Sequence, residues 1–224
     1  MTAIFVTGTG TDVGKTFVTA GLIRHFCAAG RVVEAIKPVV SGFDPAGLPT
    51  SDPGVLLAAL GRPATMDEVE RIAPWRFAAP LSPDLAAARE GRTIVFDDLL
   101  NFSRRAAATR NVLLIEGVGG IMVPLDNKHT VIDWVKALRV PVLLVAGSYL
   151  GTISHTLTAL HVLAQRNVEI AAVVVSESET SGATLDETVT SIARFAQPID
   201  VIGVPRLTQD AGLHPAFGQI AKLI

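Results

Sequence analysis

The fold is decided by Ile4-Phe5-Val6-Thr7-Gly8-Thr9-Gly10-Thr11-Asp12-Val13-Gly14-Lys15-Thr16, in which an apolar run leads through a glycine-rich segment into Gly-Lys-Thr. This order predicts a buried strand, a turn and the start of a helix. The helix continues with apolar residues at Phe17, Ala20, Leu22, Ile23 and Phe26. Small residues let backbone N–H groups approach phosphate oxygens, and a helix N-terminus favours their negative charge. The stretch therefore predicts a nucleoside-triphosphate site.

Gly-Lys-Thr supplies the two side chains that such a site needs. Lys15 can reach the β- and γ-phosphates, and the hydroxyl of Thr16 can bind Mg²⁺. The spacing departs from the usual G-x-x-x-x-G-K-[ST] pattern, because Thr9 stands where the first glycine would fall and Gly8 lies one residue too early. A chance Gly-Lys-Thr in an ordinary turn is the alternative. The strand before it and the amphipathic helix after it favour the phosphate-binding interpretation.

Size and charge restrict the class of protein. The chain has 224 residues, of which 49% are hydrophobic, and a mean hydropathy of +0.44. Such a chain can bury a substantial core, and no linker or repeat marks a boundary, so we expect residues 1–224 to form one domain. The net charge is −2 and the pI is about 6.2. This balance gives no electrostatic footprint for nucleic acid or an anionic membrane, and we expect neither as a partner.

Three features predict a cytoplasmic protein. Cys27 is the one cysteine, which excludes an intrachain disulfide and suits a reducing compartment; its place on the first helix predicts a buried, inert thiol. Met1-Thr2-Ala3 leads directly into the phosphate-binding strand, so we expect no signal peptide. Residues 140–165 contain no Asp, Glu, Lys or Arg. Interruptions such as Pro141 and Gly147 predict a buried strand followed by a packed helix there, and not a membrane span.

Short aliphatic runs alternate with helical patterns along the chain. The runs cover residues 32–36, 112–115, 142–145, 171–175 and 201–204. Near-continuous apolar strands separated by helices predict a doubly wound, mostly parallel α/β sheet of the P-loop NTPase type, with helices on both faces. The longest expected loop covers residues 41–53. Loops at the carboxyl ends of strands carry the ligands in this fold class.

Charged residues lie at the ends of these strands. Lys37 follows the second strand, Asp52 lies in the long loop, and Glu116 follows a central strand and opens a Gly-rich turn. Each has an ordinary alternative: a strand-terminal Lys is usually a solvated cation, an Asp between Ser and Pro usually caps a helix, and a Gly-rich turn is usually only a turn. The sequence names no structural partner for Lys37. In a wound sheet these strand ends meet, so both lysines and both carboxylates would surround one triphosphate, with oxygen ligands that suit Mg²⁺.

Together these features resemble the dethiobiotin synthetase family. The matching segments lie in order over nearly the full chain: Val6-Thr7-Gly8-Thr9 through Asp12-Val13-Gly14-Lys15-Thr16, Lys37-Pro38-Val39 with Ser41-Gly42, Ser51-Asp52, Ser82-Pro83, Glu116-Gly117-Val118-Gly119-Gly120 with Pro124-Leu125, Leu150-Gly151 and Gly203-Val204-Pro205. The lengthened phosphate loop is itself this family's form. The resemblance implies an ATP-dependent cyclo-ligase of biotin biosynthesis, which makes dethiobiotin, ADP and phosphate from 7,8-diaminononanoate, CO₂ and ATP. It also implies a homodimer with the diamine bound across the interface.

The resemblance further implies which residues act in catalysis. Lys37 would lie between a carbamate and the γ-phosphate, and Lys15 would hold the β/γ oxygens. Thr16, Asp52 and Glu116 would place Mg²⁺. Every intermediate of this reaction is anionic, so catalysis should come mainly from positioning and charge stabilisation, without a nucleophile on the protein.

Binding residues are implied in the same way. Ser41 and Thr11 would contact the substrate, and the helix that opens at Gly151 and Thr152 would offer N–H groups to the substrate carboxylate. The implied ATP-binding residues are Asp12, Val13, Gly14, Lys15, Thr16, Phe17, Asp52, Glu116, Gly117, Val118, Gly119, Ser176, Glu177, Pro205, Arg206 and Leu207.

Two positions depart from the family pattern. Better-known members end the fifth strand with Asn-Asp, which reads the adenine edge, whereas this chain has Ser176-Glu177. A Ser cannot present the paired donor and acceptor of an Asn amide, so we expect weaker base selectivity. Ser154-His155 stands where Asn-His is commoner, which is expected to loosen contact with the diamine tail. The His residues at 25, 129, 161 and 214 are scattered along the chain, as surface or capping groups are, and indicate no zinc site.

The alternative function is a partner-binding regulatory ATPase of the chromosome-partition or division-site type. Such switches share the wound sheet and the Gly-Lys-Thr loop, and would use ATP to control a dimer. Their loop resembles Lys-Gly-Gly-x-Gly-Lys-Thr, however, and Gly10 stands where their extra Lys would fall. The segment 215–224 is also too short for their membrane helix and contains one basic residue, Lys222. These features favour the ligase.

Overall fold

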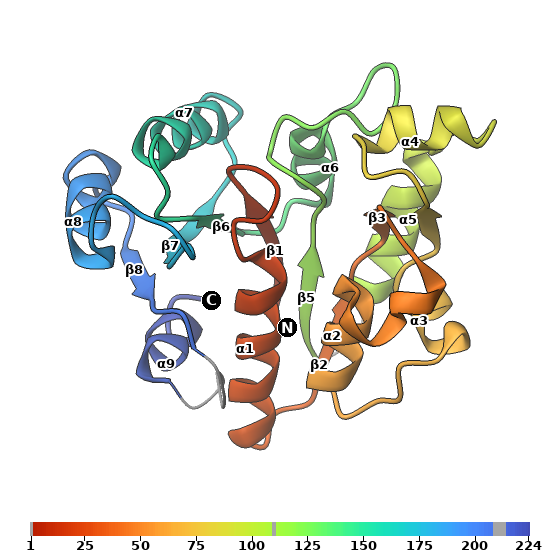
Figure 1. The fold of residues 1–224 in the computed structure, drawn as a ribbon, viewed down its shortest axis with the longest axis horizontal. Helices are drawn as coiled ribbons and strands as arrows, with labels where there is room; N and C mark the ends of the chain where they lie inside the picture. Colours follow the sequence, from red (N-terminus) through yellow and green to blue (C-terminus); the bar gives the residue numbers. More distant parts are fainter. Residues whose placement is uncertain (1, 109–110, 208–213) are drawn as a thin grey trace.

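The computed structural model describes residues 2–108, 111–207 and 214–224 (Figure 1). Its main sheet has six strands in the order β2-β5-β1-β6-β7-β8, and all neighbouring pairs are parallel. These strands are β1 (Thr2–Gly8), β2 (Val33–Ile36), β5 (Val112–Glu116), β6 (Val142–Ala146), β7 (Ile170–Ser176) and β8 (Val201–Val204). A separate two-stranded parallel sheet pairs β3 (Val39–Ser41) with β4 (Trp75–Phe77).

The chain winds in both directions from the centre of the main sheet. It passes from β1 to the edge strand β2 and returns through β5, then continues on the other side of β1 through β6, β7 and β8. The connecting helices are α1 (Lys15–Ala28), α2 (Asp52–Ala59), α3 (Met66–Ile72), α4 (Pro83–Arg89), α5 (Phe96–Ala107), α6 (Val131–Leu138), α7 (Thr152–Gln165), α8 (Leu185–Ala196) and α9 (Pro215–Ala221). A crevice for ligands is expected beside β1, where the winding direction reverses.

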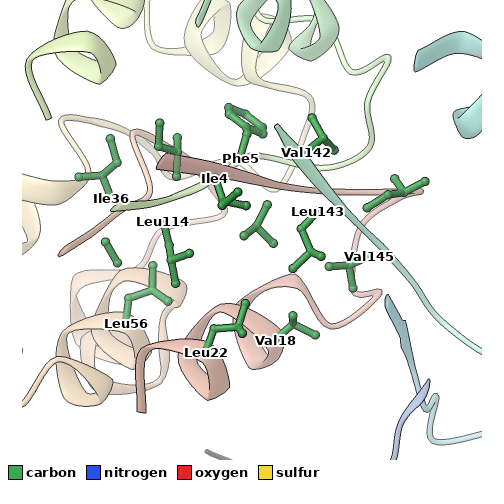
Figure 2. Packing of buried hydrophobic residues seen from close by; sticks show 14 of the residues in the cluster. Ile4, Phe5, Val18, Leu22, Ile36, Leu56, Leu114, Val142, Leu143 and Val145 are labelled. Carbon is green, nitrogen blue, oxygen red and sulfur yellow. The ribbon is translucent and has the colours of Figure 1, made fainter. Parts of the chain in front are cut away.

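Side chains on β1 explain why the central strands are apolar throughout. Ile4 and Phe5 point to opposite faces of the sheet, as successive residues of a strand do (Figure 2). Val18 and Leu22 of α1 are buried on the face toward which Ile4 points. Phe5 packs edge-on against Trp134 of α6, with ring centroids 4.8 Å apart. Because helices cover both faces, each central strand needs apolar residues at every position.

The structure confirms the predicted doubly wound parallel sheet. The aliphatic runs at 112–115, 142–145, 171–175 and 201–204 each lie inside a strand. At 32–36 the strand begins one residue later than the aliphatic run, since β2 starts at Val33 and Val32 is 65% exposed. The uncharged stretch 140–165 divides into β6 and α7 as expected. Among the described residues, no helix has both the length and the apolar character needed to cross a membrane.

One expectation about the first half of the chain is wrong, and one element there was not predicted. Residues 41–53 are not a continuous loop, because Pro45–Thr50 forms a 3₁₀ helix and α2 begins at Asp52. The side chain of Asp44 accepts a hydrogen bond from the N–H of Ala46 and so starts this 3₁₀ helix. Local capping thus gives structure to a segment whose Pro and Gly content had indicated a loop. The small sheet of β3 and β4 was also not predicted, since runs of three residues carry little periodicity.

The expected burial of Cys27 is wrong as well. Cys27 is exposed in the last turn of α1. Phe26 takes the core-facing position in that turn and is 2% exposed. The next residue along an α-helix is rotated by about 100°, which turns Cys27 toward solvent.

Candidate active site

The phosphate loop joins β1 to α1 through residues 9–14. Gly14 precedes the helix with a φ of 93°, a left-handed conformation that favours glycine. A side chain at Gly14 would also collide with Ser176, whose Oγ lies 2.4 Å from the position of a Cβ atom. The Nζ of Lys15 donates a hydrogen bond to the carbonyl oxygen of Gly10 at 2.7 Å, inside the loop. The side chain of Lys15 therefore folds back over the loop and reaches its opposite end at Gly10.

A cavity of about 720 Å³ opens beside this loop at the carboxyl edge of β1. We call it the first cavity. It is lined by Thr11, Asp12, Gly14, Lys15, Thr16, Phe17, Lys37, Val40, Ser41, Gly42, Phe43, Thr50, Ser51, Asp52, Pro80, Leu81, Ser82, Pro83, Val118, Gly119 and Val123. The lining therefore combines the phosphate loop with segments that lie far away in sequence.

Four polar side chains form a compact group, of which Thr16, Lys37 and Asp52 line this cavity whereas Glu116 does not. The Nζ of Lys37 lies 2.6 Å from Oδ2 of Asp52 and 2.6 Å from Oε1 of Glu116. The Oγ1 of Thr16 lies 2.8 Å from Oδ1 of Asp52 and 2.6 Å from Oε1 of Glu116, so its hydroxyl can donate to either carboxylate. Lys37 and Glu116 are almost completely buried, at 3% and 0% exposure. The predicted convergence of these strand ends is thus present in the structure.

Two ordinary interpretations are excluded by this geometry. Lys37 is not a solvated surface cation, and it has two structural partners that the sequence did not name, Asp52 and Glu116. Asp52 is not the cap of α2, because the side chain of Ser51 accepts the capping hydrogen bond from the N–H of Gly54. Asp52 is the first residue of the helix, and this position turns its carboxylate toward Lys37.

Burial and charge shift the ionisation of both lysines. Burial and, next, the nearby positive charge of Lys37 lower the pKa of Lys15 from 10.5 to about 8, against the attraction of Glu116 and Asp52. Burial alone would also lower the pKa of Lys37, but Glu116 and Asp52 outweigh it and hold this pKa above its usual value. Burial acts to raise the pKa of Asp52, yet Lys37 and the hydroxyl of Thr16 bring it below the usual range. Lys37 and Asp52 are therefore an ionised pair, whereas the pKa of Lys15 lies close to neutral pH.

The donor set fits a hydrated divalent cation. Oε2 of Glu116 is fully buried, and no residue in the described parts of the chain gives it a hydrogen-bond partner. The other oxygen of this carboxylate, Oε1, lies 2.6 Å from the hydroxyl of Thr16, which in turn lies 2.8 Å from Oδ1 of Asp52, and all of these groups are hard oxygen donors. Within the described residues, no group of three His, Cys, Asp or Glu side chains could hold a metal ion. Mg²⁺ does not need one, because it keeps several waters and takes one or two carboxylates together with phosphate oxygens.

The residues expected to contact the substrate are divided between two places. Thr11 and Ser41 line the first cavity, and Oγ of Ser41 is buried without a partner in the part of the chain that the structure describes. Gly151 and Thr152 lie elsewhere, at the start of α7. The hydroxyl of Thr152 donates to the carbonyl oxygen of Gly147, and its N–H donates to that of Tyr149. Both donors of Thr152 are thus engaged inside its own loop.

A second cavity of about 410 Å³ lies on the other side of the phosphate loop. It is lined by Asp12, Val13, Gly14, Phe17, Ser176, Glu177, Ser178, Glu179, Arg206 and Leu207. Oε2 of Glu177 accepts a hydrogen bond from the N–H of Arg206 at 2.9 Å, which joins the ends of β7 and β8. Phe17 lines both cavities, whereas Pro205 lines neither. The residues implied for binding the base therefore gather here.

Several lining residues were not identified from the sequence. Val40, Phe43 and Leu81 give the first cavity an apolar wall, and Ser178 and Glu179 complete the second. The apolar residues carried no signal, because a buried apolar side chain looks the same whether it faces a core or a cavity. Ser178 and Glu179 directly follow Ser176-Glu177 at a strand end, and that position was the signal that could have found them.

Comparisons with known proteins show which family the chain resembles over most of its length. A family model described as an AAA domain matches residues 2–209. The ATP-dependent dethiobiotin synthetase of Caulobacter sp. (strain K31) is 52% identical over 208 residues, which cover 92% of this chain and 89% of that protein. The ATP-dependent dethiobiotin synthetase of Acidiphilium cryptum (strain JF-5) is 50% identical over 196 residues, which cover 87% of this chain and 88% of that protein.

Solved structures with this fold include the cell division ATPase MinD of Pyrococcus furiosus. It gives a TM-score of 0.58 at 15% identity, covering 100% of this chain and 98% of that chain. A ParA family ATPase of Chlorobium tepidum TLS gives a TM-score of 0.51 at 14% identity, covering 99% of this chain and 91% of that chain. At such low identity the likeness shows the P-loop NTPase fold alone.

Proposed function

Since the chain belongs to the dethiobiotin synthetase family, whose members are ATP-dependent ligases of biotin biosynthesis, we propose that it closes the ureido ring of dethiobiotin from 7,8-diaminononanoate, CO₂ and ATP. One amine of the diamine captures CO₂ as a carbamate, and a carbamate oxygen attacks the γ-phosphorus, which breaks its bond to the β,γ-bridging oxygen and releases ADP. The second amine then attacks the carbonyl carbon, which closes the ring and expels phosphate.

The observation that carries this proposal is that Lys15, Lys37 and Asp52 line one cavity, with the buried Glu116 held against Lys37. Two lysines near a phosphate loop match a reaction in which each intermediate is an anion. We assign Lys37 to the carbamate and the transferring phosphoryl group, and Lys15 to the β/γ oxygens. Bound phosphates would also favour the charged form of Lys15, whose pKa is about 8 in the free protein.

We assign Mg²⁺ to Thr16, Asp52 and Glu116, on the basis of the unpartnered Oε2 of Glu116. When bound, the ion would neutralise charge on the phosphates. Ser41 and Thr11 would hold the reacting end of the diamine, since both line the first cavity and the Ser41 hydroxyl lacks a partner among the described residues. The start of α7 at Gly151 and Thr152 would receive the substrate carboxylate through the helix dipole and N–H groups beyond Thr152.

The second cavity is proposed to hold the base of ATP. Arg206 and Leu207 would pack against it, with backbone groups near Pro205 as donors and acceptors. Ser176 presents one hydroxyl where an amide would present a paired donor and acceptor, which supports the expectation of weak base selectivity.

Several properties of the whole protein belong to the same proposal. We propose a cytoplasmic homodimer with the diamine bound across the interface, and no nucleic-acid or membrane partner. We also propose that residues 1–224 form one domain, because a single buried cluster contains residues from β1, β2, β5, β6, β7 and β8. The alternative of a partition or division-site ATPase is not favoured. The solved division ATPase resembles this chain in fold alone, whereas a synthetase is about half identical to it in sequence over most of its length.

The direct test measures phosphate release from ATP by the purified protein. We expect release only when 7,8-diaminononanoate and bicarbonate are both present, together with formation of dethiobiotin in equal amount. ATPase activity that is independent of the diamine, without dethiobiotin, would contradict the proposed function and favour the regulatory ATPase.

A further inference from the structure

Two serines bind each other reciprocally beyond the ends of β6 and β7. The N–H of Ser148 donates to Oγ of Ser178 at 2.9 Å, and the N–H of Ser178 donates to Oγ of Ser148 at 2.9 Å. Ser148 is 3% exposed. In parallel strands the backbone ladder pairs residues up to Ala146 and Val175, so the serines continue the connection after the ladder ends.

The surrounding residues lock this pair. Gly147 approaches it so closely that a Cβ atom there would lie 2.7 Å from Oγ of Ser178. The hydroxyl of Ser181 also points at the carbonyl oxygen of Ser148. The two loops therefore cannot shift relative to each other without breaking several hydrogen bonds.

Each loop leads to a different candidate binding place. Ser178 lines the second cavity beside Glu177, which in turn accepts a hydrogen bond from the N–H of Arg206. On the other side, the hydroxyl of Thr152 donates to the carbonyl oxygen of Gly147, so the start of α7 is tied directly to the loop that contains Ser148. A chain of hydrogen bonds thus runs from the second cavity to the first turn of α7.

We infer that Ser148 and Ser178 are positioning residues that couple occupancy of the second cavity by a nucleotide base to binding of the substrate carboxylate at the start of α7. The inference rests on the proposed function, which assigns those two ligands to those two places. A base that packs against residues 177–179 stabilises the hydrogen-bonded position of Ser178, and Ser178 in turn stabilises the loop that sets the first turn of α7. The first turn of α7 is then already ordered when the diamine binds.

The test measures how strongly 7,8-diaminononanoate improves the binding of two phosphate ligands. One is the β,γ-imido analogue of ATP, which carries a base, and the other is inorganic tripolyphosphate, which lacks one. Each Kd is determined by calorimetry with and without saturating diamine. In the unmodified protein we expect the improvement to be about fivefold larger for the ATP analogue than for tripolyphosphate. Equal improvements would overturn the inference without any mutant.

Variants then test whether the coupling passes through the serines. Ser178→Ala and Ser148→Ala should reduce the improvement for the ATP analogue to that for tripolyphosphate, while Ser178→Thr, which keeps the hydroxyl, should restore it. Ser191→Ala on α8 is the matched control and should behave as the unmodified protein. Full coupling in both alanine variants would overturn the inference. Dethiobiotin formation by the unmodified protein is measured separately, so failure of the coupling and failure of the proposed function give different results.

Discussion

The two cavities on either side of the phosphate loop differ in how they are built. The first is organised by ionised side chains, with Lys37 2.6 Å from each of two carboxylates, Asp52 and Glu116. The second contains hydroxyls, a glutamate already used by a backbone N–H, the side chain of Leu207, and charged side chains such as Glu179 and Arg206, which are exposed and only 3.8 Å apart at their nearest charged atoms. Charged groups held in fixed positions discriminate strongly, whereas single hydroxyls and packing discriminate weakly. If the proposed assignments hold, we expect stronger specificity for phosphate, metal and carbamate than for the base.

The largest expected effect comes from Lys37→Met. Removal of this charge should lower kcat/KM for dethiobiotin formation by about a thousandfold or more, because a preorganised cation at the transferring group is lost. It should also leave Asp52 and Glu116 without compensation and lower the free energy of unfolding by about 3 kcal/mol. Because the sequence names no partner for Lys37, the sequence alone would instead predict an unchanged melting temperature. Lys128→Met, at an exposed lysine, is the control, and activity that survives in Lys37→Met would remove this residue from the site.

The second effect concerns the metal. Asp52→Asn and Glu116→Gln should each raise the Mg²⁺ concentration for half-maximal activity by roughly tenfold or more, because each removes a charged oxygen donor. Activity is titrated against Mg²⁺, with Glu70→Gln as an exposed control. If both variants keep the metal requirement of the unmodified protein while losing only stability, their carboxylates serve Lys37 alone.

The third effect lies in the second cavity. We expect CTP or GTP to support measurable synthesis, because the single hydroxyl of Ser176 replaces an amide, and a lost polar discriminator is worth roughly 1 to 3 kcal/mol, or about tenfold to a hundredfold. Ser176→Asn should sharpen the preference for ATP, whereas Ser191→Asn should not. Specificity constants for the four triphosphates provide the measurement. Strict use of ATP by the unmodified protein would show that other groups read the base and would remove the contrast between the cavities.

The smallest effect is the pH dependence that Lys15 confers on the first cavity. Its pKa is lowered from 10.5 to about 8 in the free protein, so between pH 8 and 10.5 the unfolded state binds more protons and the ligand-free protein gains stability as pH rises. Phosphate binding favours the charged form, so ADP binding in this window should take up a proton, and its Kd should rise about tenfold between pH 7 and pH 9.

Calorimetry in buffers with different ionisation enthalpies measures this proton uptake. Lys15→Met should abolish it and should flatten the rise in stability between pH 8 and 10.5. Proton uptake that persists in Lys15→Met would assign the effect to another group.

Most of the fold could be predicted from the sequence, and the candidate site only in outline. Strands such as β5 and β6 were identifiable because strands covered by helices on both faces are apolar at every position. Lys37, Asp52 and Glu116 were identified as neighbours because the carboxyl ends of parallel strands meet at one edge. Their hydrogen-bond pattern was not predictable, since it depends on side-chain positions to within a few tenths of an ångström.

The sequence by itself determined the nucleotide-binding loop, the doubly wound sheet and the family, because these follow from patterns within about ten residues or from matches that keep their order. The tertiary structure alone decided that Lys37 is a buried ion-pair partner, that Cys27 faces solvent, and that Ser148 and Ser178 join two loops. The physical reason is that burial and hydrogen bonding depend on what packs against a residue, and such a neighbour can lie far away along the chain, as Glu116 does at 79 positions from Lys37.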